Sequence, residues 1–328
     1  LLYPILKEIR QYDGLDLQLV ATTMHLSDEF GLTYQQIEKD GFKIDEKIDN
    51  LSKVDSNSSM AKSSGVAIIL LAECFEKLSP DIVLLLGDRF ETHAAATTAL
   101  LMNIPIAHVH GGEVTQGAVD EQLRHAITKM SYLHFCSTNV YRHRIIQMGE
   151  DASKVFNFGA PGIDNIVNMS LLTRNDLNAQ LDWKLPEKFS LFTYHSTTLE
   201  FNDINQELDS IFDILIEVGI GVLFTYANAD FGGKIINNRI EDFCKLDTNK
   251  YKVVKNLGQL RYLSVMKYAN LLIGNTSSGI IEAASFYKPV VNIGNRQLGR
   301  LRGVNVIDCM IQELHQSIIL AMSNDFII

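Results

Sequence analysis

Two short polar stretches of the first half of the chain, each following an apolar run, bring acids, bases and glycines to the predicted ends of two strands. One reads Gly-Asp88-Arg89 and the other His110-Gly-Gly-Glu113. In an open parallel sheet, ligands bind outside the carboxyl ends of the strands. We therefore expect these residues to share a site whose carboxylates and imidazole transfer protons. The alternative for Asp88 and Arg89 is a simple ion pair that caps the next helix.

The helix predicted after the second stretch carries two further charged pairs. Asp120 and Arg124 are four residues apart, and so are Glu121 and His125. Each pair therefore fits one helix face, where it could be only a surface ion pair. The glycine-rich lead-in places the start of this helix beside His110, which favours a functional role for Asp120.

A second set of candidates lies in the second half, in the motif Gly-Asn-Thr-Ser277-Ser278-Gly279 between a predicted strand and a predicted helix. Backbone N–H groups at a helix N-terminus suit a phosphate or diphosphate. Glu282, one turn further on, is placed to accept hydrogen bonds from ribose hydroxyls, and an ordinary capped helix is the alternative. Two cations of the next loop and a histidine at a strand end, able to act as an acid, complete the set: Arg296, Arg300 and His195.

We expect no metal and no cofactor. His108, His110, Glu113 and Asp120 are all possible ligands, but their spacing matches no zinc pattern. His108 also falls inside a predicted strand. The sequence contains no GxGxxG after a strand, no GxxxxGK[ST] and no GxSxG. The sequence therefore contains no motif that would indicate a dinucleotide oxidoreductase, a nucleoside triphosphatase or a serine hydrolase of the α/β type.

Composition excludes several classes of protein. A net charge of −10 argues against nonspecific binding to nucleic acid or to an anionic membrane. The longest uninterrupted apolar run, 66–72, is far shorter than the roughly 20 residues of a membrane helix, so we expect a cytoplasmic protein. The four cysteines are too widely spaced for a metal or redox motif and are expected to be reduced core residues: Cys74, Cys136, Cys244 and Cys309.

The length of 328 residues exceeds what one hydrophobic core usually supports and indicates two domains. Strands and helices alternate, and the strands are almost entirely apolar, which is typical of a parallel sheet covered on both sides. The predicted strands are 15–19, 42–48, 81–86, 104–109, 132–136, 155–158, 189–194, 221–226, 251–254, 271–273 and 290–293. The predicted helices are 1–12, 34–39, a long helix ending near 78, 90–102, 118–130, 205–217, 233–244, 260–268, 279–286 and 312–322.

This alternation predicts an α/β fold of two Rossmann-like domains, 1–168 and 169–328, facing each other across a cleft. A polar segment, 173–188, lies near the predicted boundary. The chain is also expected to lack its natural beginning. In a doubly wound domain the first helix follows a first strand and a phosphate-facing turn, and this sequence opens on a predicted helix.

Four blocks of sequence resemble the hydrolysing UDP-N-acetylglucosamine 2-epimerases of sialic-acid-type sugar synthesis. The blocks are GDRFETHAAATTALLMNIPIAHVHGGE, DEQLRHAITKM, FNFGAPGIDNI and GNTSSGIIEAASFYKPVVNIGNRQLGR. The resemblance implies a fold of the glycosyltransferase-B type, with the sugar on the first domain and UDP on the second. It also implies a two-stage reaction, in which UDP is eliminated to leave a glycal and water then adds to give N-acetylmannosamine.

The resemblance also implies roles for individual residues. Asp88, Asp120 and His195 match positions associated with catalysis, while His110 stands where some relatives have Glu, so His110 or Glu113 takes that acid or base role. Ser277, Ser278 and Glu282 match the diphosphate and ribose contacts, and Arg296 lies in the nucleotide-side loop. Three further residues are expected to bind the substrate: Arg89, Gly279 and Arg300.

Several alternatives stay open. The same chemistry on UDP-N,N′-diacetylbacillosamine is one, a glycosyltransferase of the same fold is a second, and a noncatalytic nucleotide-sugar sensor is a third. A homodimer or homotetramer is expected from the resemblance alone.

Overall fold

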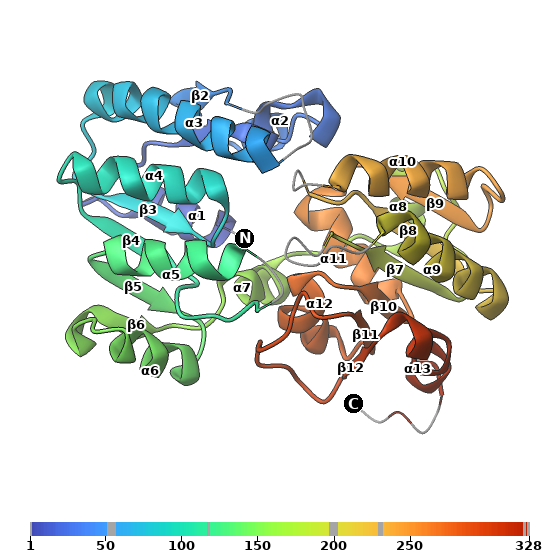
Figure 1. Ribbon diagram of the computed structural model, residues 1–328. Coiled ribbons are helices and arrows are strands. Elements are labelled where there is room, and N and C mark those ends of the chain that lie inside the picture. Colours follow the sequence, from blue (N-terminus) through green and yellow to red (C-terminus); the bar gives the residue numbers. More distant parts are fainter. Residues whose placement is uncertain are drawn as a thin grey trace. The chain divides into compact units, whose positions relative to one another are not determined.

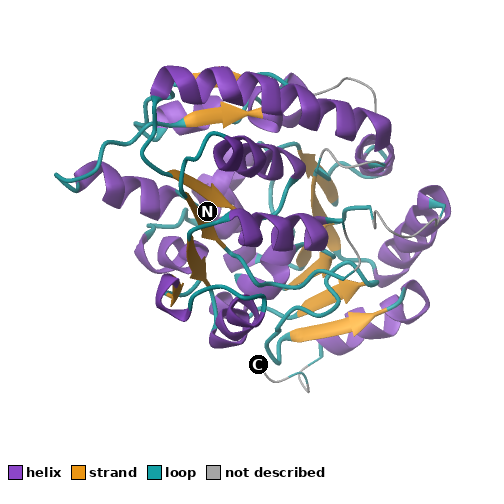
Figure 2. Ribbon diagram, turned by 60° about the vertical axis from the view of Figure 1, so that its left-hand side comes forward, coloured by secondary structure: helices purple, strands orange, loops and turns teal. Residues whose placement is uncertain are grey.

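The computed structural model describes residues 2–50, 57–116, 119–196, 203–228, 232–323 and 326. The chain divides into two compact units. The first comprises Leu1–Thr115 and Val119–Asn165, and the second comprises Gln116–Ala118 and Ile166–Ile328 (Figure 1). Both units alternate strands with helices (Figure 2), and all strand pairings of the described residues are parallel. The predicted α/β class is therefore confirmed.

The first unit contains a four-stranded sheet in the order β3-β4-β5-β6 and a separate two-stranded sheet, β1-β2. Its helices and strands are α1 (Tyr3–Gln11), β1 (Val20–Thr22), η1 (Thr23–Leu26), η2 (Asp28–Phe30), α2 (Tyr34–Lys39), β2 (Glu46–Ile48), α3 (Asn57–Leu78), β3 (Val83–Leu86), α4 (Phe90–Leu101), β4 (Ile106–Val109), α5 (Asp120–Met130), β5 (Leu133–Cys136), α6 (Asn139–Gln147), η3 (Ala152–Lys154) and β6 (Val155–Asn157). Helix α7 (Pro161–Asn168) contains the division between the units.

The core of the first unit lies between the sheet and helices α3 and α4. Four alanines of α4 are buried in it, which lets the neighbouring helices approach closely. Within the described residues, one helix segment, Ser58–Leu78, is long and apolar enough to cross a membrane by length and composition alone. Its residues Ala67, Leu71, Cys74 and Phe75 belong to this core. A core helix passes the same test, so the finding is weak support for a membrane span.

The second unit is built on a six-stranded sheet in the order β12-β11-β10-β7-β8-β9, so β7 and β10 are neighbours in the sheet although two strands, β8 and β9, lie between them in the chain. Its elements are α8 (Arg174–Leu181), β7 (Phe189–Thr193), α9 (Ile204–Val218), β8 (Gly221–Thr225), α10 (Gly233–Cys244), β9 (Tyr251–Val254), α11 (Gly258–Tyr268), β10 (Leu271–Gly274), α12 (Ser277–Ile281), η4 (Ala283–Phe286), β11 (Val290–Ile293), β12 (Val306–Cys309), η5 (Ile311–Glu313) and α13 (Leu314–Ala321).

Alternate residues of these strands enter two different cores, because side chains on a strand point to opposite faces. Phe192 and Phe224 join the cluster formed with α9, α10 and α13. Leu191 and Leu223 join the cluster formed with α8 and α11. Both faces are therefore covered, which explains why the strands read as continuous apolar runs.

Several predicted boundaries are corrected by the structure. The strand expected at 15–19 is wrong, because the partner strand β2 begins only at Glu46 and pairs with β1 from Val20 onward. The polar segment 173–188 holds helix α8, and β12 was missed. The helix expected at 279–286 is two pieces, α12 and η4, with Glu282 between them. All four cysteines are free and buried, as predicted.

Tyr287 gives a first testable prediction. It follows η4 with φ 52° and ψ 45°, a left-handed conformation that is unfavourable for a residue with a bulky side chain and favourable for glycine, and the residue is 76% exposed. Tyr287→Gly should therefore raise the free energy of unfolding by about 0.5–1 kcal/mol, measured by thermal unfolding. Tyr287→Ala loses the same exposed ring but keeps the unfavourable φ, so it should bring no gain. A gain of equal size in both variants would contradict this explanation.

Candidate active site

The turn after β4 brings His110 and Glu113 together. Gly112 in this turn has φ 75°, and a Cβ there would lie 2.6 Å from the carbonyl oxygen of Tyr141, so only glycine fits. His110 itself has φ 67°. The tight turn folds the His110 ring back so that its Nδ1 lies 2.5 Å from Oε1 of Glu113. Both side chains are buried.

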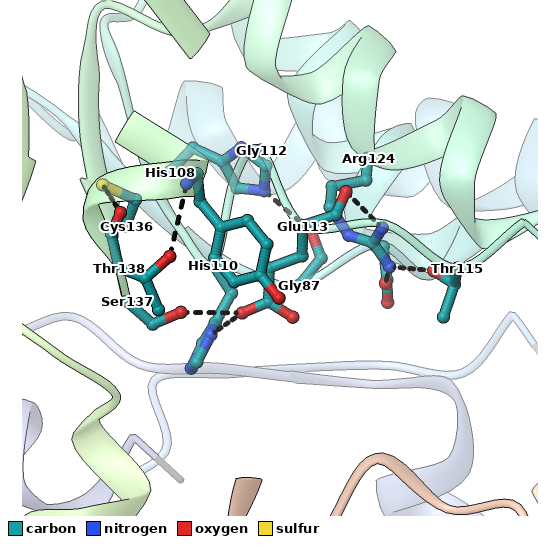
Figure 3. A network of polar contacts seen from close by, with 12 residues as sticks. Gly87, His108, His110, Gly112, Glu113, Thr115, Arg124, Cys136, Ser137 and Thr138 are labelled. Atoms are coloured by element: carbon teal, nitrogen blue, oxygen red, sulfur yellow. Dashed lines mark hydrogen bonds and ion pairs between the residues drawn. The ribbon is translucent and has the colours of Figure 1, made fainter. Parts of the chain in front are cut away.

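The contacts of Glu113 determine which nitrogen of His110 carries the proton. Ser137 Oγ donates to the same Oε1 at 3.1 Å, and Figure 3 shows the Glu113 side chain between His110 and Ser137. A carboxylate only accepts hydrogen bonds, so a neutral His110 ring donates from Nδ1 and has its lone pair on Nε2. His110 and Glu113 therefore form a dyad in which the carboxylate orients the imidazole and leaves its Nε2 able to accept a proton.

Arg124 connects this turn to the end of β3. Its guanidinium donates to Asp88 Oδ2, to the Glu113 carbonyl oxygen at 2.9 Å and to Thr115 Oγ1 at 2.6 Å. The side chain is only 1% exposed. Burial acts to lower the pKa of Arg124, but the nearby carboxylates of Asp88, Glu113 and Asp120 raise it by more than burial lowers it. The net shift of the pKa is upward, and the guanidinium stays charged.

These contacts correct two interpretations made from sequence. The ion pair joins Asp88 to Arg124, whereas Arg89 Nε donates to Glu91 at 3.1 Å. Arg124 is buried and therefore no part of a surface pair with Asp120. Asp120 is the first residue of α5 and is also buried. The first unit thus brings Asp88, His110, Glu113 and Asp120 into the surroundings of one guanidinium.

His108 lies within β4, as predicted, and both of its ring nitrogens are hydrogen-bonded within the first unit. Its Nε2 donates to the Gly87 carbonyl oxygen at 2.8 Å, and its Nδ1 accepts from Thr128 Oγ1 at 3.3 Å. Burial lowers the pKa of His108 to about 4, outweighing the hydrogen bond to Gly87, which raises it. The ring is therefore neutral in the folded protein at neutral pH.

This lowered pKa predicts acid sensitivity. Between about pH 6.5 and 4 an unfolded His108 binds a proton that the folded one does not, so stability is present above pH 6.5 and is lost as the pH falls. The gap between the two pKa values corresponds to about 3 kcal/mol, of which about 2 kcal/mol is lost by pH 5. His108→Gln should remove that part of the decrease in thermal unfolding between pH 7 and pH 5. His93→Gln, at a half-buried histidine, should remove less, and an unchanged pH dependence in His108→Gln would contradict the assignment.

The second group of predicted residues surrounds the turn between β10 and α12. Gly274 has φ 133°, and a Cβ there would lie 1.9 Å from the Thr193 carbonyl oxygen, so the close approach of β7 and β10 requires glycine. Thr276 caps α12 by accepting from the Ser278 N–H. Because α12 has only five residues, the helix dipole invoked from sequence is weak here. Ser277 and Gly279 lie in α12, and Gly279 is buried.

Ser278 has a direct side-chain partner. Its hydroxyl donates to Glu282 Oε2, and Glu282 is the C-cap of α12. Tyr262 lies close to the side chains of Ser278 and Thr193, and burial raises its pKa, so the phenol stays protonated. Ser278, Glu282 and Tyr262 form one polar cluster beside the turn.

His195 follows β7 and is held by two asparagines. The Asn228 backbone N–H donates to His195 Nδ1 at 3.1 Å, so a neutral ring carries its proton on Nε2. The Asn275 side chain accepts from the His195 N–H and donates to its carbonyl oxygen, both at 2.8 Å. His195 therefore has the opposite tautomer to His110, and it suits a donor rather than a base.

The two predicted arginines belong to the loop after β11. Arg296 Nη1 donates to the Asn275 carbonyl oxygen at 3.1 Å, so this loop is tied to the β10–α12 turn. Arg300 is buried, and its carbonyl oxygen accepts from Arg302 Nε at 3.2 Å. The second unit brings His195, Ser278, Glu282 and Arg296 to the same end of its sheet, around Asn275.

Sequence reasoning missed several residues that the structure places in these networks. They are Thr115, Ser137, Asn228, Tyr262 and Asn275. Among them only Asn275 carried a signal, because it stands inside the glycine- and serine-rich motif. For metals, the ranges that the structure describes hold no group of three or more His, Cys, Asp or Glu side chains that fits an ion.

Comparisons with known proteins place these features in a family. The sequence model described as UDP-N-acetylglucosamine 2-epimerase matches residues 7–324. The chain is 43% identical to the GDP/UDP-N,N′-diacetylbacillosamine 2-epimerase (hydrolyzing) of Campylobacter jejuni, over 99% of this chain and 85% of that protein. It is 38% identical to the UDP-N,N′-diacetylbacillosamine 2-epimerase (hydrolyzing) of Legionella pneumophila, over 94% of this chain and 81% of that protein.

The fold is also similar to that of a solved structure. The UDP-GlcNAc 2-epimerase of Methanocaldococcus jannaschii, solved in complex with UDP-GlcNAc and UDP, matches 99% of this chain and 90% of its own, with a TM-score of 0.79 and 16% identity. At that level of identity the match supports the glycosyltransferase-B type fold alone.

Proposed function

Because the chain belongs to the UDP-N-acetylglucosamine 2-epimerase family, we propose that it is a hydrolysing 2-epimerase that acts on UDP-N,N′-diacetylbacillosamine. The observation that carries the choice of sugar is the identity of 43% and 38% to two relatives that bear this activity in their names. The sequence alone put UDP-N-acetylglucosamine first, with the diacetylated sugar as the alternative. The named relatives favour the alternative.

The proposed reaction has two stages. In the first, the bond between C1 and the diphosphate oxygen breaks, C2 loses its proton, and a C1–C2 double bond forms. In the second, a proton adds to C2 from the opposite face while water adds to C1, giving the free 2-epimer and UDP. Because no carbonyl acidifies the C2 proton, departure of UDP must lead, and charge stabilisation at the diphosphate matters most.

The dyad of the first unit is assigned the removal of the C2 proton, and the proton that adds to the opposite face of C2 is drawn from solvent. His110 presents a basic Nε2 because Glu113 accepts from its Nδ1. Removal of the C2 proton leaves an imidazolium beside the Glu113 carboxylate, which stabilises the new charge. Asp88 and Asp120, near the Arg124 guanidinium, are assigned to the sugar hydroxyls and to the incoming water.

The polar cluster of the second unit is assigned to UDP. His195, whose Nε2 carries the proton, donates to the leaving diphosphate. Ser277, Ser278 and Gly279 supply hydroxyl and backbone donors, and Glu282 accepts from ribose hydroxyls. Arg296 and Arg300 supply positive charge, as Arg89 does in the first unit. A homodimer or homotetramer remains a prediction.

The test is incubation of the purified chain with UDP-N,N′-diacetylbacillosamine, GDP-N,N′-diacetylbacillosamine and UDP-N-acetylglucosamine in parallel. The expected result is release of UDP and free 2-epimer from the first compound, with a kcat/KM at least about tenfold above that for UDP-N-acetylglucosamine. In D₂O the product should carry one deuterium at C2, which follows from the elimination and rehydration.

Other outcomes would overturn the proposal in distinguishable ways. Preference for UDP-N-acetylglucosamine would identify that sugar nucleotide as the substrate, as the sequence alone first suggested. Product formation only when an acceptor alcohol is added would identify a glycosyltransferase. Tight binding of the nucleotide sugar with no turnover would identify a sensor.

A further inference from the structure

One buried asparagine joins the three segments that carry the assigned groups of the second unit. Asn275 is 1% exposed and lies in the turn between β10 and α12. Its backbone N–H donates to the Thr193 carbonyl oxygen at 3.1 Å, which continues the pairing of β10 with β7 past the last strand residue. This contact sets the position of the Asn275 side chain beside the end of β7.

The Asn275 side chain closes a two-point contact with the His195 backbone. Its Oδ1 accepts from the His195 N–H and its Nδ2 donates to the His195 carbonyl oxygen, each at 2.8 Å. An amide that both donates and accepts in this way mimics a strand neighbour, so His195 is held as though the sheet extended one residue further. Aspartate lacks the donor, and alanine lacks both groups.

The Asn275 carbonyl oxygen binds the loop after β11. Arg296 Nη1 donates to it at 3.1 Å and Gln297 Nε2 at 2.7 Å. Gln297 is fully buried, so this second contact is shielded from water. A substitution of the Asn275 side chain removes the contacts with His195 but keeps the backbone carbonyl that binds Arg296 and Gln297. Such a variant therefore tests the contacts with His195 separately from the contacts with the loop.

We propose that Asn275 is the positioning residue for His195, holding the backbone of that histidine so that its Nε2–H reaches the leaving diphosphate. This inference rests on the proposed function, which assigns the acid role to His195. The Asn228 N–H holds the ring through Nδ1, and Asn275 holds the backbone from which the ring extends. A displacement of about 1 Å at a catalytic group is enough to cost about a hundredfold in rate.

The experiment is a double-mutant cycle on UDP release. Asn275→Ala should lower kcat about 30- to 100-fold with KM changed less than about threefold, because the ground-state contacts of the substrate remain. In a His195→Ala background the same substitution should lower kcat by less than about threefold, because the group that it positions is already gone. An equal loss in both backgrounds would show that Asn275 acts independently of His195 and would overturn the proposal.

Asn270, which directly precedes β10 as Asn275 directly follows it, offers a matched control. Its Oδ1 accepts from the Phe189 N–H at 3.0 Å, the same chemistry at the opposite end of β7. Asn270→Ala should lower thermal stability without lowering kcat. If Asn275→Ala fails to fold, the isosteric Asn275→Asp, which replaces the donor to the His195 carbonyl oxygen by a carboxylate oxygen, should show the same loss of kcat and the same dependence on His195.

A measurement without substrate separates this inference from the proposed function. The ¹⁵N and ¹H NMR signals of the His195 ring, assigned with the His195→Ala variant, should report an Nε2–H tautomer in the wild type and a mixture in Asn275→Ala. An unchanged His195 spectrum in Asn275→Ala overturns the positioning role. Absence of UDP release by the wild type overturns the proposed function and leaves the spectral test intact.

Discussion

Replacing His110 by glycine should lower kcat by about three orders of magnitude, within the range of about 10²–10⁴ that general acid–base catalysis contributes. Glycine suits this position because His110 has φ 67°, so the turn is kept while the imidazole is removed. Added imidazole should restore part of the rate, because the deleted ring leaves space beside Glu113. The measurement is UDP release at saturating sugar nucleotide, with and without imidazole.

The companion variant Glu113→Gln tests which member of the dyad transfers the proton. An amide NH₂ donating to His110 Nδ1 would move the ring proton to Nε2, the wrong nitrogen for a base, so kcat should fall by about two to three orders of magnitude. The double variant should be no slower than His110→Gly alone, because the two residues act as a unit.

The opposite result would assign the base to Glu113. In that case His110→Gly would keep a rate within about tenfold of the wild type, imidazole would have no effect, and only Glu113→Gln would be inactive. His143→Ala is the control, since His143 is an exposed histidine of α6 in the same unit and should leave kcat unchanged. His110→Gly and Glu113→Gln together therefore decide whether His110 or Glu113 is the base, which the sequence left open.

The strand ends that carry the candidate residues were predictable from sequence. Continuous apolar runs end where Asp88 and His110 begin, and a parallel sheet brings such ends to one edge. The predicted strands 251–254 and 290–293 agree with β9 and β11. The contact between His110 and Glu113 could also be predicted from sequence, because a two-glycine turn between an imidazole and a carboxylate brings the two side chains together.

The partners of these residues were not predictable, for two physical reasons. Helical spacing places Asp120 and Arg124 on one face of α5 but does not say whether that face meets water, so a surface ion pair stayed open as an alternative for the buried guanidinium. The contact of Asn275 with His195 spans 80 residues and depends on β7 lying next to β10 in the sheet. Strand order of this kind follows from the packing of the whole unit and leaves no local pattern in the amino-acid sequence.

The same buried guanidinium carries the largest expected effect on stability. Arg124→Met should lower the free energy of unfolding by about 3–5 kcal/mol, because it leaves the Asp88 carboxylate without its partner and removes the donors to Glu113 O and Thr115 Oγ1. Differential scanning calorimetry measures the loss. Arg142→Met is the control, since within the described part of the chain Arg142 donates to the carbonyl oxygens of Val155 and Ala152 and has no carboxylate partner.

The double variant Asp88→Asn/Arg124→Met separates stability from catalysis. Removing both charges should recover about 1–3 kcal/mol relative to Arg124→Met, because the cost of leaving the partly buried Asp88 carboxylate without its partner disappears. UDP release should stay at least about a hundredfold below the wild type, since the proposed function needs the Asp88 carboxylate at the sugar. Recovery of stability together with full activity would show that Asp88 serves the fold alone. No recovery of stability would show that the bonds from Arg124 to Glu113 and Thr115, rather than its charge, hold the turn.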